Sequence, residues 1–471
     1  MLNRDPDQKT GPVNETRPGA RVDPVERVYS LLLGLIRPLL PLARSLPPKV
    51  ADAIEGRRLA SSEARAWAAR ERRPEVPLLW LHAASAGELS GAVPVIRLLR
   101  QEHPELQLAI TVSSPSGLPL ARSIEPEFTG YAPLDTPAES ASMLESLRPD
   151  ALVFVKLDVW PGLSHSATEA GVPLGMINGT VRPDSSRLRS PTRQFLRSTY
   201  ARLDSVGVVG QPDADALEML GVDPARIRIT GDAAFDQALA TADTGRSSGV
   251  TVLPARSPGR VRLLGGSTWP PDEDVLLEVA REIGPRLDLV LVPHEPSPEA
   301  IERIVERCRS VWGQDPLILS ELTGSPDANE GGAESVEPDG DVAVPLVVDA
   351  MGLLAGLYLE ADLALVGGAF DATGLHSVIE PAAAGIPVLF GPVYDRREAE
   401  DLLGRNAALA VTRQDAAELI RELIDDPDRM ETMGSAARVY AEESGDAAGE
   451  GARLVSELLE LGLSRRRPDS R

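Results

Sequence analysis

The sequence predicts an α/β fold made of two halves, each a mostly parallel sheet with helices on both faces. Two observations carry this prediction. Short apolar runs of strand character alternate with segments of helical periodicity from Pro77 onward. The alternation then lapses over residues 238–259, which are rich in Ala, Thr, Gly, Ser and Pro, and it resumes afterwards. A break of that composition is typical of a linker between domains.

The apolar runs place the expected strands. In the first half they are residues 76–82, 106–112, 151–155, 172–177, 205–209 and 227–230, with helices over 89–102 and from 117. In the second half they are residues 261–265, 287–292, 317–320, 344–348, 363–366 and 387–390. Residues 416–463 have helical periodicity and end the fold.

These patterns suggest a division of the chain. We expect a disordered tail (1–23), a membrane-associating segment (24–50), a first Rossmann-like domain (51–240), a linker (241–259), a second Rossmann-like domain (260–440) and a C-terminal helix and tail (441–471). An acidic stretch rich in Gly, Pro and Ser predicts a mobile insertion at 321–341. In open α/β sheets of this kind, ligands bind at the carboxyl ends of the strands. The two halves are therefore expected to face each other across a cleft.

Composition excludes several classes of function. The net charge of −23 makes broad nucleic-acid binding improbable, because that binding requires many cations to neutralise phosphates. The single cysteine, Cys308, excludes an intramolecular disulfide and a thiolate metal cluster. The five histidines are scattered without zinc-ligand spacing. We expect no metal, no cofactor and a reducing cellular setting.

Residues 28–43 are apolar but are interrupted by Arg37 and two prolines. The uninterrupted apolar part of the segment is too short to cross a membrane as a helix. It lies in a locally basic part of an acidic protein, which favours an interfacial helix on anionic lipid. The alternative is a helix packed on the protein's own core.

The strongest candidate site in the first half is His82-Ala-Ala-Ser-Ala-Gly-Glu88. Here a strand ends, small residues follow and a helix begins. Small residues let the backbone approach a ligand, and the carboxylate of Glu88 is placed to accept a proton from a hydroxyl. The alternative is that Glu88 is a favourable first-turn acid.

The second half offers three further segments. Gly265-Gly-Ser-Thr268 follows a strand as a possible phosphate nest, with a structural turn as the alternative. Gly367-Gly368 precedes a helix expected near Ser377 that carries Glu380 in its first turn, a pairing that suits a nucleotide. His294 follows a strand and is a candidate for a phosphate or sugar contact, with a structural role as the alternative. In the first half, Asp213 and Asp215 have the spacing of a metal-binding pair, but they open a helical stretch and are interpreted as a cap and a first-turn acid.

Together these segments resemble the 3-deoxy-D-manno-octulosonic acid (Kdo) transferases of lipid A assembly, which have the two-Rossmann glycosyltransferase fold called GT-B. The resemblance runs from about Val28 to Leu459. It is carried by Trp80-Leu-His82 with Ser85-Ala-Gly-Glu88, Ser113-Ser-Pro-Ser-Gly117, Asp158-Val-Trp160-Pro161, Gly171-Val-Pro173 with Ile177-Asn178, Gly231-Asp232 with Phe235-Asp236, Gly266-Ser267-Thr268, Val292-Pro293, Asp349-Ala-Met-Gly352 with Tyr358, Ala361-Asp362, and Gly367-Gly368 through His376 and Glu380 to Gly391-Pro392.

The resemblance implies an inverting transfer of Kdo from CMP-Kdo to a hydroxyl of a lipid A precursor, at the cytoplasmic face of the inner membrane, with Glu88 as general base. It implies that the second half binds the donor, through Gly266, Ser267, Thr268, Pro293, His294, Gly368, His376, Ser377 and Glu380. It implies that the first half binds the acceptor, through Ser85, Gly87, Ser113, Ser114, Asp158 and Trp160. The partners would be a CMP-activated sugar, a lipid A precursor and the membrane surface, without nucleic acid.

The chain departs from the family pattern at four positions. Lys156 replaces a second acid before Asp-x-Trp-Pro, and His294 follows Pro293 without the Arg of Pro-Arg-His. Gly374-Leu375-His376-Ser377 stands in place of Gly-Gly-His-Asn, and Ala234 replaces a Lys before Phe-Asp. The lost groups fall partly at the donor site and point to a divergent branch.

Two other functions fit the same patterns. One is another sugar-nucleotide transferase or epimerase of two Rossmann halves. The other is a catalytically weakened binding protein. The apolar N-terminal segment argues against a soluble epimerase, and the retained Glu88 and Glu380 argue against a protein that only binds.

Overall fold

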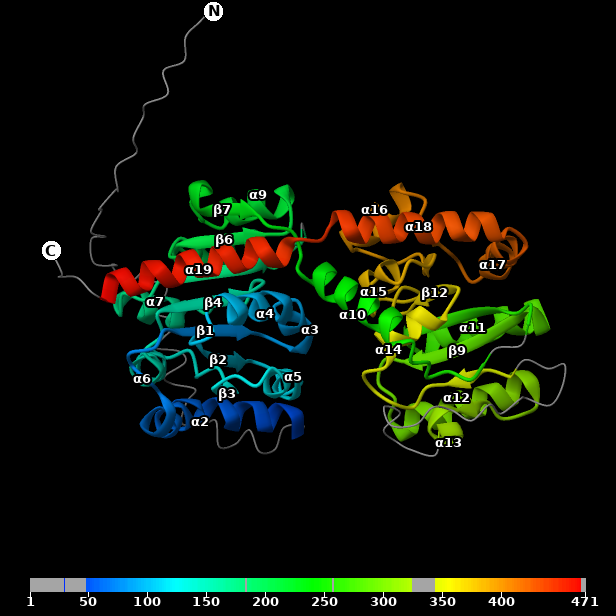
Figure 1. The fold of residues 1–471 in the computed structure, drawn as a ribbon, viewed down its shortest axis with the longest axis horizontal. Coiled ribbons are helices and arrows are strands. Elements are labelled where there is room, and N and C mark those ends of the chain that lie inside the picture. The colour runs from blue at the N-terminus through cyan, green and yellow to red at the C-terminus, as the bar shows by residue number, and fades with distance from the viewer. Residues whose placement is uncertain (1–28, 30–47, 183, 256–257, 324–343, 467–471) are drawn as a thin grey trace, which may run out of the picture. The chain divides into compact units, whose positions relative to one another are not determined.

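The computed structural model describes residues 29, 48–182, 184–255, 258–323 and 344–466 (Figure 1). The chain divides into two compact units. The first contains residues 1–89, 97–230 and 451–471, and the second contains residues 90–96 and 231–450. Each unit is an α/β fold and is described by itself.

The first unit contains a seven-stranded sheet of order β3-β2-β1-β4-β5-β6-β7, in which all pairings are parallel. Its strands are β1 (Leu78–Ala83), β2 (Gln107–Val112), β3 (Phe128–Tyr131), β4 (Ala151–Val155), β5 (Leu174–Gly179), β6 (Ser205–Val208) and β7 (Ile227–Ile229). Its helices are α2 (Pro48–Glu71), α3 (Ala86–Ser90), α4 (Val93–Glu102, shared with the second unit), α5 (Gly117–Ser123), α6 (Pro137–Leu147), α7 (Pro161–Glu169), η2 (Ser186–Leu188), α8 (Thr192–Tyr200), α9 (Gln211–Met219), η3 (Pro224–Arg226) and most of α19 (Ala447–Arg466).

The central strands of this sheet are buried throughout. Every residue of β1, β2, β4 and β5 is buried, as expected for parallel strands covered by helices on both faces. The core packs Trp80 of β1 and Phe154 of β4 together with Tyr200 of α8. Burial of this apolar surface, at about 25 cal/mol per Å², holds the sheet and its helices together.

The order of the first sheet reverses between β1 and β4. The chain runs outward from β1 through β2 to β3 and then returns to β4 on the other side. The connections that follow β1 and β4 therefore lead to opposite sides of the sheet, starting from its carboxyl edge. This is the place where doubly wound sheets bind ligands.

The second unit contains a seven-stranded parallel sheet of order β10-β11-β9-β8-β12-β13-β14. Its strands are β8 (Val261–Thr268), β9 (Leu287–Pro293), β10 (Leu317–Ile318), β11 (Leu346–Val347), β12 (Leu363–Val366), β13 (Val388–Phe390) and β14 (Ala408–Ala410). Its helices are α10 (Ala234–Ser248), α11 (Pro270–Ile283), η4 (Gly284–Arg286), α12 (Pro298–Trp312), α13 (Leu319–Thr323), α14 (Leu354–Leu357), η5 (Tyr358–Glu360), α15 (Ile379–Ala383), α16 (Arg397–Gly404), α17 (Ala416–Asp425) and α18 (Pro427–Glu443).

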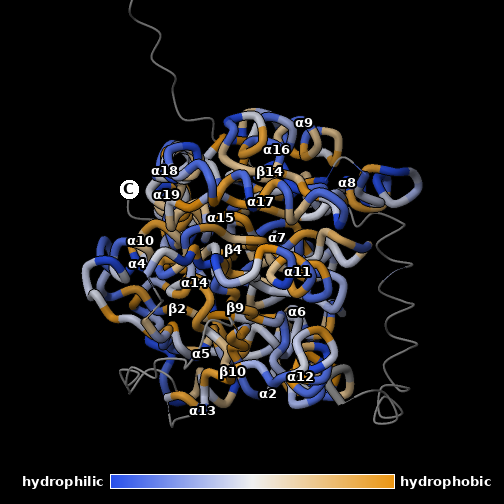
Figure 2. Tube along the Cα trace, turned by 90° about the vertical axis from the view of Figure 1, so that its right-hand side faces the viewer, coloured by the Kyte–Doolittle hydropathy of each residue, from blue (hydrophilic) through white to orange (hydrophobic). Residues whose placement is uncertain are grey.

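The helices of this unit are amphipathic. In α12, Ala300, Ile304 and Cys308 recur every four residues and are buried, while the intervening positions include the charged pairs Glu302-Arg303 and Glu306-Arg307. Figure 2 shows the same mixture of hydrophobic and hydrophilic residues along the helices. The reversal of strand order lies between β8 and β12, so the loops after Thr268 and Val366 start at the corresponding place of the second sheet.

The two parallel sheets confirm the predicted α/β fold with two Rossmann-like units. Two strands were not predicted, β3 and β14. Both are short: β3 has four residues and includes Gly130, and β14 has three residues, two of them alanine. Neither composition gives a clear strand signal.

The domain boundaries differ from those drawn from the sequence. The first unit ends at Thr230, and α10 occupies much of the expected linker because residues 234–248 continue as a helix to Gly249. Gly249 has a φ of 62° and ends that helix in the left-handed conformation that glycine favours. The C-terminal helix α19 returns to the first unit.

The predicted tail (1–23), nearly all of the membrane-associating segment (24–50) and most of the insertion (321–341) lie outside the described residues. Among the helices of the described ranges, none has the length and apolar character needed to cross a membrane.

Candidate active site

Glu88 lies in the short helix α3, just beyond the carboxyl end of β1. Its Oε2 accepts a hydrogen bond from the backbone N–H of Ala84 at 2.8 Å, so the carboxylate is turned back toward the end of the strand. The side chain is half-buried. A carboxylate held this way, by a single backbone donor at the edge of a sheet, has a fixed position and free lone pairs for a substrate proton.

A second carboxylate, that of Asp158, stands at the carboxyl edge of the same sheet. Its Oδ2 lies 3.1 Å from Nε2 of His82, 3.0 Å from the hydroxyl of Ser113 and 3.1 Å from Nε1 of Trp160. An ionised carboxylate only accepts, so the imidazole, the hydroxyl and the indole all donate to one oxygen. The side chain thus ties together the ends of β1 and β2 and the loop after β4.

His82 is fully buried, and a hydrogen bond at its other ring nitrogen fixes its orientation. Its Nδ1 lies 3.0 Å from the hydroxyl of Thr111, and that hydroxyl accepts from the indole N–H of Trp80 at 2.8 Å. In a neutral ring whose Nε2–H donates to Asp158, Nδ1 accepts from the Thr111 hydroxyl. A continuous chain of hydrogen bonds therefore runs from the core of the sheet to Asp158.

The environment shifts the pKa values of the two carboxyls in opposite directions. Burial raises the pKa of Glu88, and the negative charge of Asp158 raises it further, against the hydrogen bond from Ala84 and the cation of Lys156. Burial also opposes ionisation of Asp158, but the hydrogen bonds from His82, Ser113 and Trp160 outweigh it, so its pKa lies below the usual value. Neighbouring acids whose pKa values are separated in this way are a signature of acid–base sites.

The loop after β4 holds its residues in a strained conformation. Lys156 has a φ of 58°, the left-handed region that side chains with a Cβ seldom adopt. Its backbone N–H donates to Ile177 at 2.9 Å, and the hydroxyl of Tyr200 donates to the carbonyl of Leu157 at 3.0 Å. Such strain persists only where the surroundings impose it and is common at functional sites.

Arg57 reaches this edge from α2. Its guanidinium stacks over the ring of Trp160 at 4.4 Å, and it donates to the carbonyl of Pro133 at 3.3 Å. Its Nε is buried and has no hydrogen-bond partner among the described residues. Burial lowers the pKa of Arg57, while Asp135 and Asp158 oppose that change. A cation is thus held beside the aromatic ring that bonds Asp158.

The remaining residues expected to bind the acceptor lie at the same edge. Ser85 lies in the turn between β1 and α3, and Gly87 lies in the first turn of α3, where an added Cβ would meet no described atom within 4 Å. Packing therefore does not require glycine there, whereas close approach of a ligand would. Ser113 bonds Asp158 as described above, and the hydroxyl of Ser114 lies 3.0 Å from that of Ser116.

In the second unit, Asp272 ties together the two loops at the strand reversal. Its Oδ2 accepts from the N–H of Trp269 at 2.8 Å and from the N–H of Gly368 at 2.9 Å. Burial raises the pKa of Asp272, and these backbone hydrogen bonds act in the opposite direction. A Cβ at Gly367 would collide with the carbonyl of Ser267, so the two loops approach as closely as backbone allows.

Three rings cluster on these loops. The ring of His294 stacks on His376 with centroids 4.3 Å apart and on Trp269 with centroids 5.0 Å apart. The indole N–H of Trp269 donates to Nε2 of His376 at 2.8 Å. Burial lowers the pKa of His376 to about 4, assisted by His294 and Arg396. The structure thus brings together His294 and His376, which the sequence analysis placed in one donor site.

The glycine turn expected after a strand at residues 265–268 is not a turn. These residues are the last part of β8, whose pairing with β9 continues to Thr268 and Pro293 across an irregularity. Gly265 and Gly266 are buried, and a Cβ on Gly266 would collide with the hydroxyl of Tyr358. Close packing therefore explains these glycines, and the expected nest is wrong. Ser267, with a φ of 53°, marks the irregularity.

The other expected donor residues follow β12. Gly368 has a φ of 90°, and the backbone N–H of His376 returns to the carbonyl of Gly367 at 3.1 Å. The helix begins at Ile379 rather than near Ser377, whose hydroxyl accepts from the N–H of Ile379 at 3.4 Å. Glu380 lies in the first turn of α15, as predicted, and is half-buried.

The acidic pair at the start of α9 acts as the sequence indicated. The carboxylate of Asp213 accepts from the N–H of Gly210 at 3.0 Å and from that of Val181 at 2.8 Å. Among the described residues, no group of three or more His, Cys, Asp or Glu side chains is arranged to hold a metal ion.

Four residues of these clusters were not assigned site roles from the sequence: Arg57, Trp269, Asp272 and Arg396. Arg57 is far along the chain from Trp160, so no local pattern connects them. Asp272 is an acid in the first turn of α11, where its carboxylate accepts from the backbone N–H of the N-cap residue Trp269. Trp269 directly follows a quoted motif and could have been considered on that ground.

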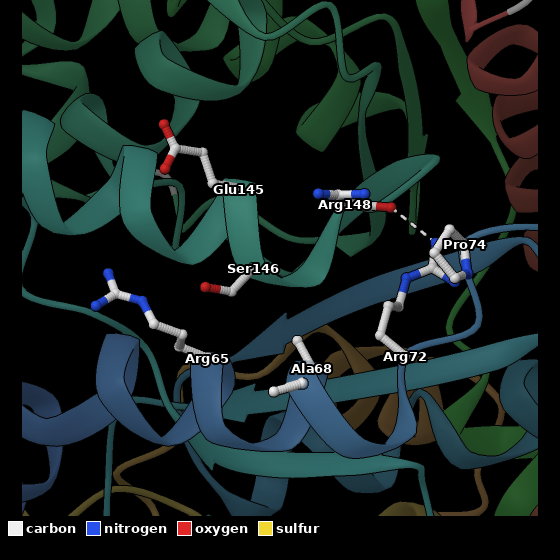
Figure 3. Close-up of a pocket in the computed structure, with 8 residues that line it drawn as sticks. Arg65, Ala68, Arg72, Pro74, Glu145, Ser146 and Arg148 are labelled. Carbon is white, nitrogen blue, oxygen red and sulfur yellow. Dashed lines mark hydrogen bonds between the residues drawn. The ribbon is translucent and has the colours of Figure 1, made fainter.

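A separate groove lies at the opposite edge of the first sheet. It has a volume of about 590 Å³ and is lined by residues from the ends of α2 and α6 that precede β1 and β4, including Arg65, Arg72, Glu145 and Arg148 (Figure 3). The guanidinium of Arg72 already donates hydrogen bonds to backbone carbonyls, among them those of Leu147 and Arg148. None of the predicted site residues lines this groove.

Comparisons of the sequence with known proteins point to one family of transferases. A sequence model of the family described as 3-deoxy-D-manno-octulosonic-acid transferase (kdotransferase) matches residues 57–237. A 3-deoxy-D-manno-octulosonic acid transferase of Chlamydophila psittaci is 28% identical over 367 residues, covering 76% of this chain and 80% of that protein. The enzyme of the same name from Bordetella pertussis is 27% identical over 388 residues, covering 79% and 85%.

Solved structures share the fold. A putative UDP-N-acetylglucosamine 2-epimerase from Listeria monocytogenes has a TM-score of 0.53 at 16% identity, covering 84% of this chain and 98% of that one. The UDP-GlcNAc 2-epimerase of Neisseria meningitidis bound to UDP-GlcNAc has a TM-score of 0.53 at 16% identity, covering 81% and 99%. At this identity the likeness concerns architecture alone. The sequence comparisons, and not these structures, bear on the family, and they support a divergent member of the Kdo transferases.

Proposed function

We propose that this protein transfers Kdo from CMP-Kdo to a hydroxyl of a lipid A precursor, with inversion and with Glu88 as general base. The observation that carries the proposal is the pair of carboxyls at the edge of the first sheet. Glu88 has a raised pKa and Asp158 a lowered one, and the sequence comparisons support membership of a family named for this transfer.

In the proposed reaction, the acceptor hydroxyl binds beside Glu88 in the first unit. Glu88 takes the hydroxyl proton as the oxygen forms a bond to the anomeric carbon of Kdo. The bond from that carbon to the phosphate oxygen breaks, and CMP leaves with the electron pair. A raised pKa suits this role, because a more basic carboxylate accepts the proton more readily.

Asp158 has a different part in this proposal. Its low pKa keeps it ionised, and its hydrogen bonds fix the positions of His82, Ser113 and Trp160 around the acceptor. Its charge keeps the pKa of Glu88 high. Arg57, stacked on Trp160, adds a cation for an anionic group of the acceptor.

The donor would be bound by the loops after β8, β9 and β12 in the second unit. His376 and the backbone around Gly368 offer hydrogen-bond donors to phosphate and carboxylate oxygens. Arg396 is an exposed cation whose charge acts on His376, and it is our candidate for the cation missing from the Pro-Arg-His segment. Glu380 would accept hydroxyl groups of the donor.

Replacement of Glu88 by Gln tests the general base. The amide keeps an oxygen for the N–H of Ala84 but does not accept a proton, so turnover should fall by about 10²–10⁴-fold with little change in donor affinity. The measurement is radiolabelled Kdo transfer from CMP-Kdo to a lipid A precursor. The exposed Glu105→Gln serves as a matched control and should retain wild-type turnover. Equal turnover in wild type and Glu88→Gln would refute the proposed role.

The same variant gives a prediction for stability. Because the pKa of Glu88 is raised in the folded protein, its ionisation costs folding free energy above that pKa. Glu88→Gln should therefore raise the melting temperature at pH 8 by a few degrees at most, roughly 1–3 °C. The gain should shrink as the pH falls through the folded pKa, because protonated Glu88 is also uncharged. A destabilised variant, or a gain independent of pH, would contradict the proposed electrostatics.

The nucleobase of the donor distinguishes this proposal from the epimerase alternative, since the solved neighbours named above are UDP-sugar enzymes. CMP at about 100 times its Kd should raise the melting temperature by several degrees, because binding to the folded state alone adds about 2.7 kcal/mol of stability. UDP at the same concentration should have a much smaller effect. Stabilisation by UDP alone would favour the sugar-nucleotide epimerase class.

We also propose that the protein works at the cytoplasmic surface of the inner membrane, attached through residues 28–43. The support is the apolar segment within a locally basic region of an acidic chain. Deletion of residues 1–43 should abolish co-sedimentation with vesicles containing anionic lipid, while transfer to a detergent-solubilised acceptor persists. Unchanged vesicle binding after the deletion would show that this segment is not the anchor.

A further inference from the structure

The bond between Trp269 and His376 defines the protonation of the imidazole. The indole Nε1 and the imidazole Nε2 are 2.8 Å apart, and the two rings are nearly coplanar, with an interplanar angle of 12°. An indole N–H is a donor without acceptor capacity. Nε2 of His376 must therefore be unprotonated, and the proton of the neutral ring lies on Nδ1.

The opposite nitrogen is then a donor. Within the part of the chain that the structure describes, the ring of His376 makes no hydrogen bond other than the one from Trp269. The side chain is half-buried, so the Nδ1–H remains accessible to a ligand. An imidazole in this state offers an N–H and no lone pair at its remaining ring nitrogen.

The surroundings favour the neutral ring. His294 stacks at 4.3 Å between centroids, and a second positive charge on His376 would be unfavourable near His294 and Arg396. Burial, His294 and Arg396 together lower the pKa of His376 to about 4, so the ring is uncharged at neutral pH. The ring of His294 stacks on both Trp269 and His376, which favours a parallel arrangement of the two bonded rings.

The backbone fixes both partners. Asp272 bonds the N–H of Trp269 and the N–H of Gly368, and the N–H of His376 bonds the carbonyl of Gly367. The loop after β8 and the loop after β12 are thus held to one carboxylate. The geometry of the Trp269–His376 bond follows from these connections and does not depend on a flexible segment.

We propose that Trp269 is a positioning residue of the donor site: it fixes His376 as the neutral Nδ1–H tautomer, so that the ring presents a hydrogen-bond donor to the anionic groups of the sugar nucleotide. The identity of the ligand rests on the proposed function. The tautomer rests only on the bond between Trp269 and His376.

The choice of tautomer matters because the ligand is an anion. Phosphate and carboxylate oxygens accept hydrogen bonds, and a lone pair facing them would be repulsive. With the proton on the other nitrogen, His376 would have to rotate or recruit water before it could bind. If the competent tautomer falls to between a half and a tenth of the population, the apparent Kd rises by about two- to tenfold.

The tautomer is measured directly in the full-length protein by ¹⁵N NMR of labelled histidine. The chain has five histidines, so His376 is assigned from the signals lost in His376→Gln. The expected result is a protonated Nδ1 and an unprotonated Nε2 from pH 6 to 8. Trp269→Phe, which removes the N–H and keeps an aromatic ring, should give a mixture of tautomers. A wild-type ring with its proton on Nε2, or a charged ring at pH 7, would overturn the proposal.

The functional part is measured as the Kd for CMP by calorimetry. Trp269→Phe should raise that Kd by about two- to tenfold. Trp312→Phe, a partly buried tryptophan in the same unit, should leave it unchanged. In a His376→Ala background, Trp269→Phe should have no further effect, because Trp269 acts through His376. An equal and additive loss in that background would show a merely structural role and would refute the proposal.

The two proposals fail in different ways. If wild-type protein does not bind CMP but His376 has the Nδ1–H tautomer, the proposed donor is wrong and the tautomer assignment holds. If CMP binds tightly and the tautomer is Nε2–H, the donor assignment holds and the role of Trp269 is wrong.

Discussion

The first unit depends on one oxygen atom, Oδ2 of Asp158, which accepts hydrogen bonds from His82, Ser113 and Trp160. These donors come from the ends of β1 and β2 and from the loop after β4. Burial alone would favour a neutral carboxyl, and three donors reverse that preference. The result is a permanent negative charge at the strand reversal. That charge, together with burial, gives Glu88 its raised pKa, so the position of one residue and the basicity of another have a common cause.

The second unit uses a carboxylate for a related purpose. Asp272 also stands at a strand reversal and also joins two loops, but its donors are the backbone N–H groups of Trp269 and Gly368. Here the carboxylate organises the backbone and leaves the outward-facing chemistry to the rings of Trp269, His294 and His376. In both units a carboxylate at the strand reversal supplies the rigidity, and a half-buried neighbour supplies the group that can meet a ligand.

Much of this could be predicted from the sequence, and the remainder has physical reasons. The buried strands β4 and β12 match their apolar runs residue for residue, because parallel strands covered on both faces are uniformly apolar. Glu88 was identified because strand, small residues and helix start are consecutive in the chain. The pairing of Arg57 with Trp160 was not found, since it depends on how α2 packs against distant loops. The misassigned nest at Gly266 shows the same limit, because a glycine needed for packing against Tyr358 has the same local pattern as one needed for phosphate.

Several departures from the family pattern change charged groups, and a charge acts on its neighbours without contact. Lys156 stands where the family pattern given above has an acid. Burial raises the pKa of Glu88, Asp158 raises it further, and the cation of Lys156 opposes that rise. The basicity of Glu88 is therefore set by burial together with a balance of opposite charges. In the second unit, the uncharged ring of His376 bonds Trp269, and the exposed Arg396 acts on it. An uncharged ring attracts an anion less strongly from afar than a cation does, so its contribution to affinity comes from a directed hydrogen bond at contact. Directed bonds require that each donor face its acceptor in the correct protonation state. The Trp269–His376 pair meets that requirement, because the indole leaves His376 only one nitrogen that can carry the proton.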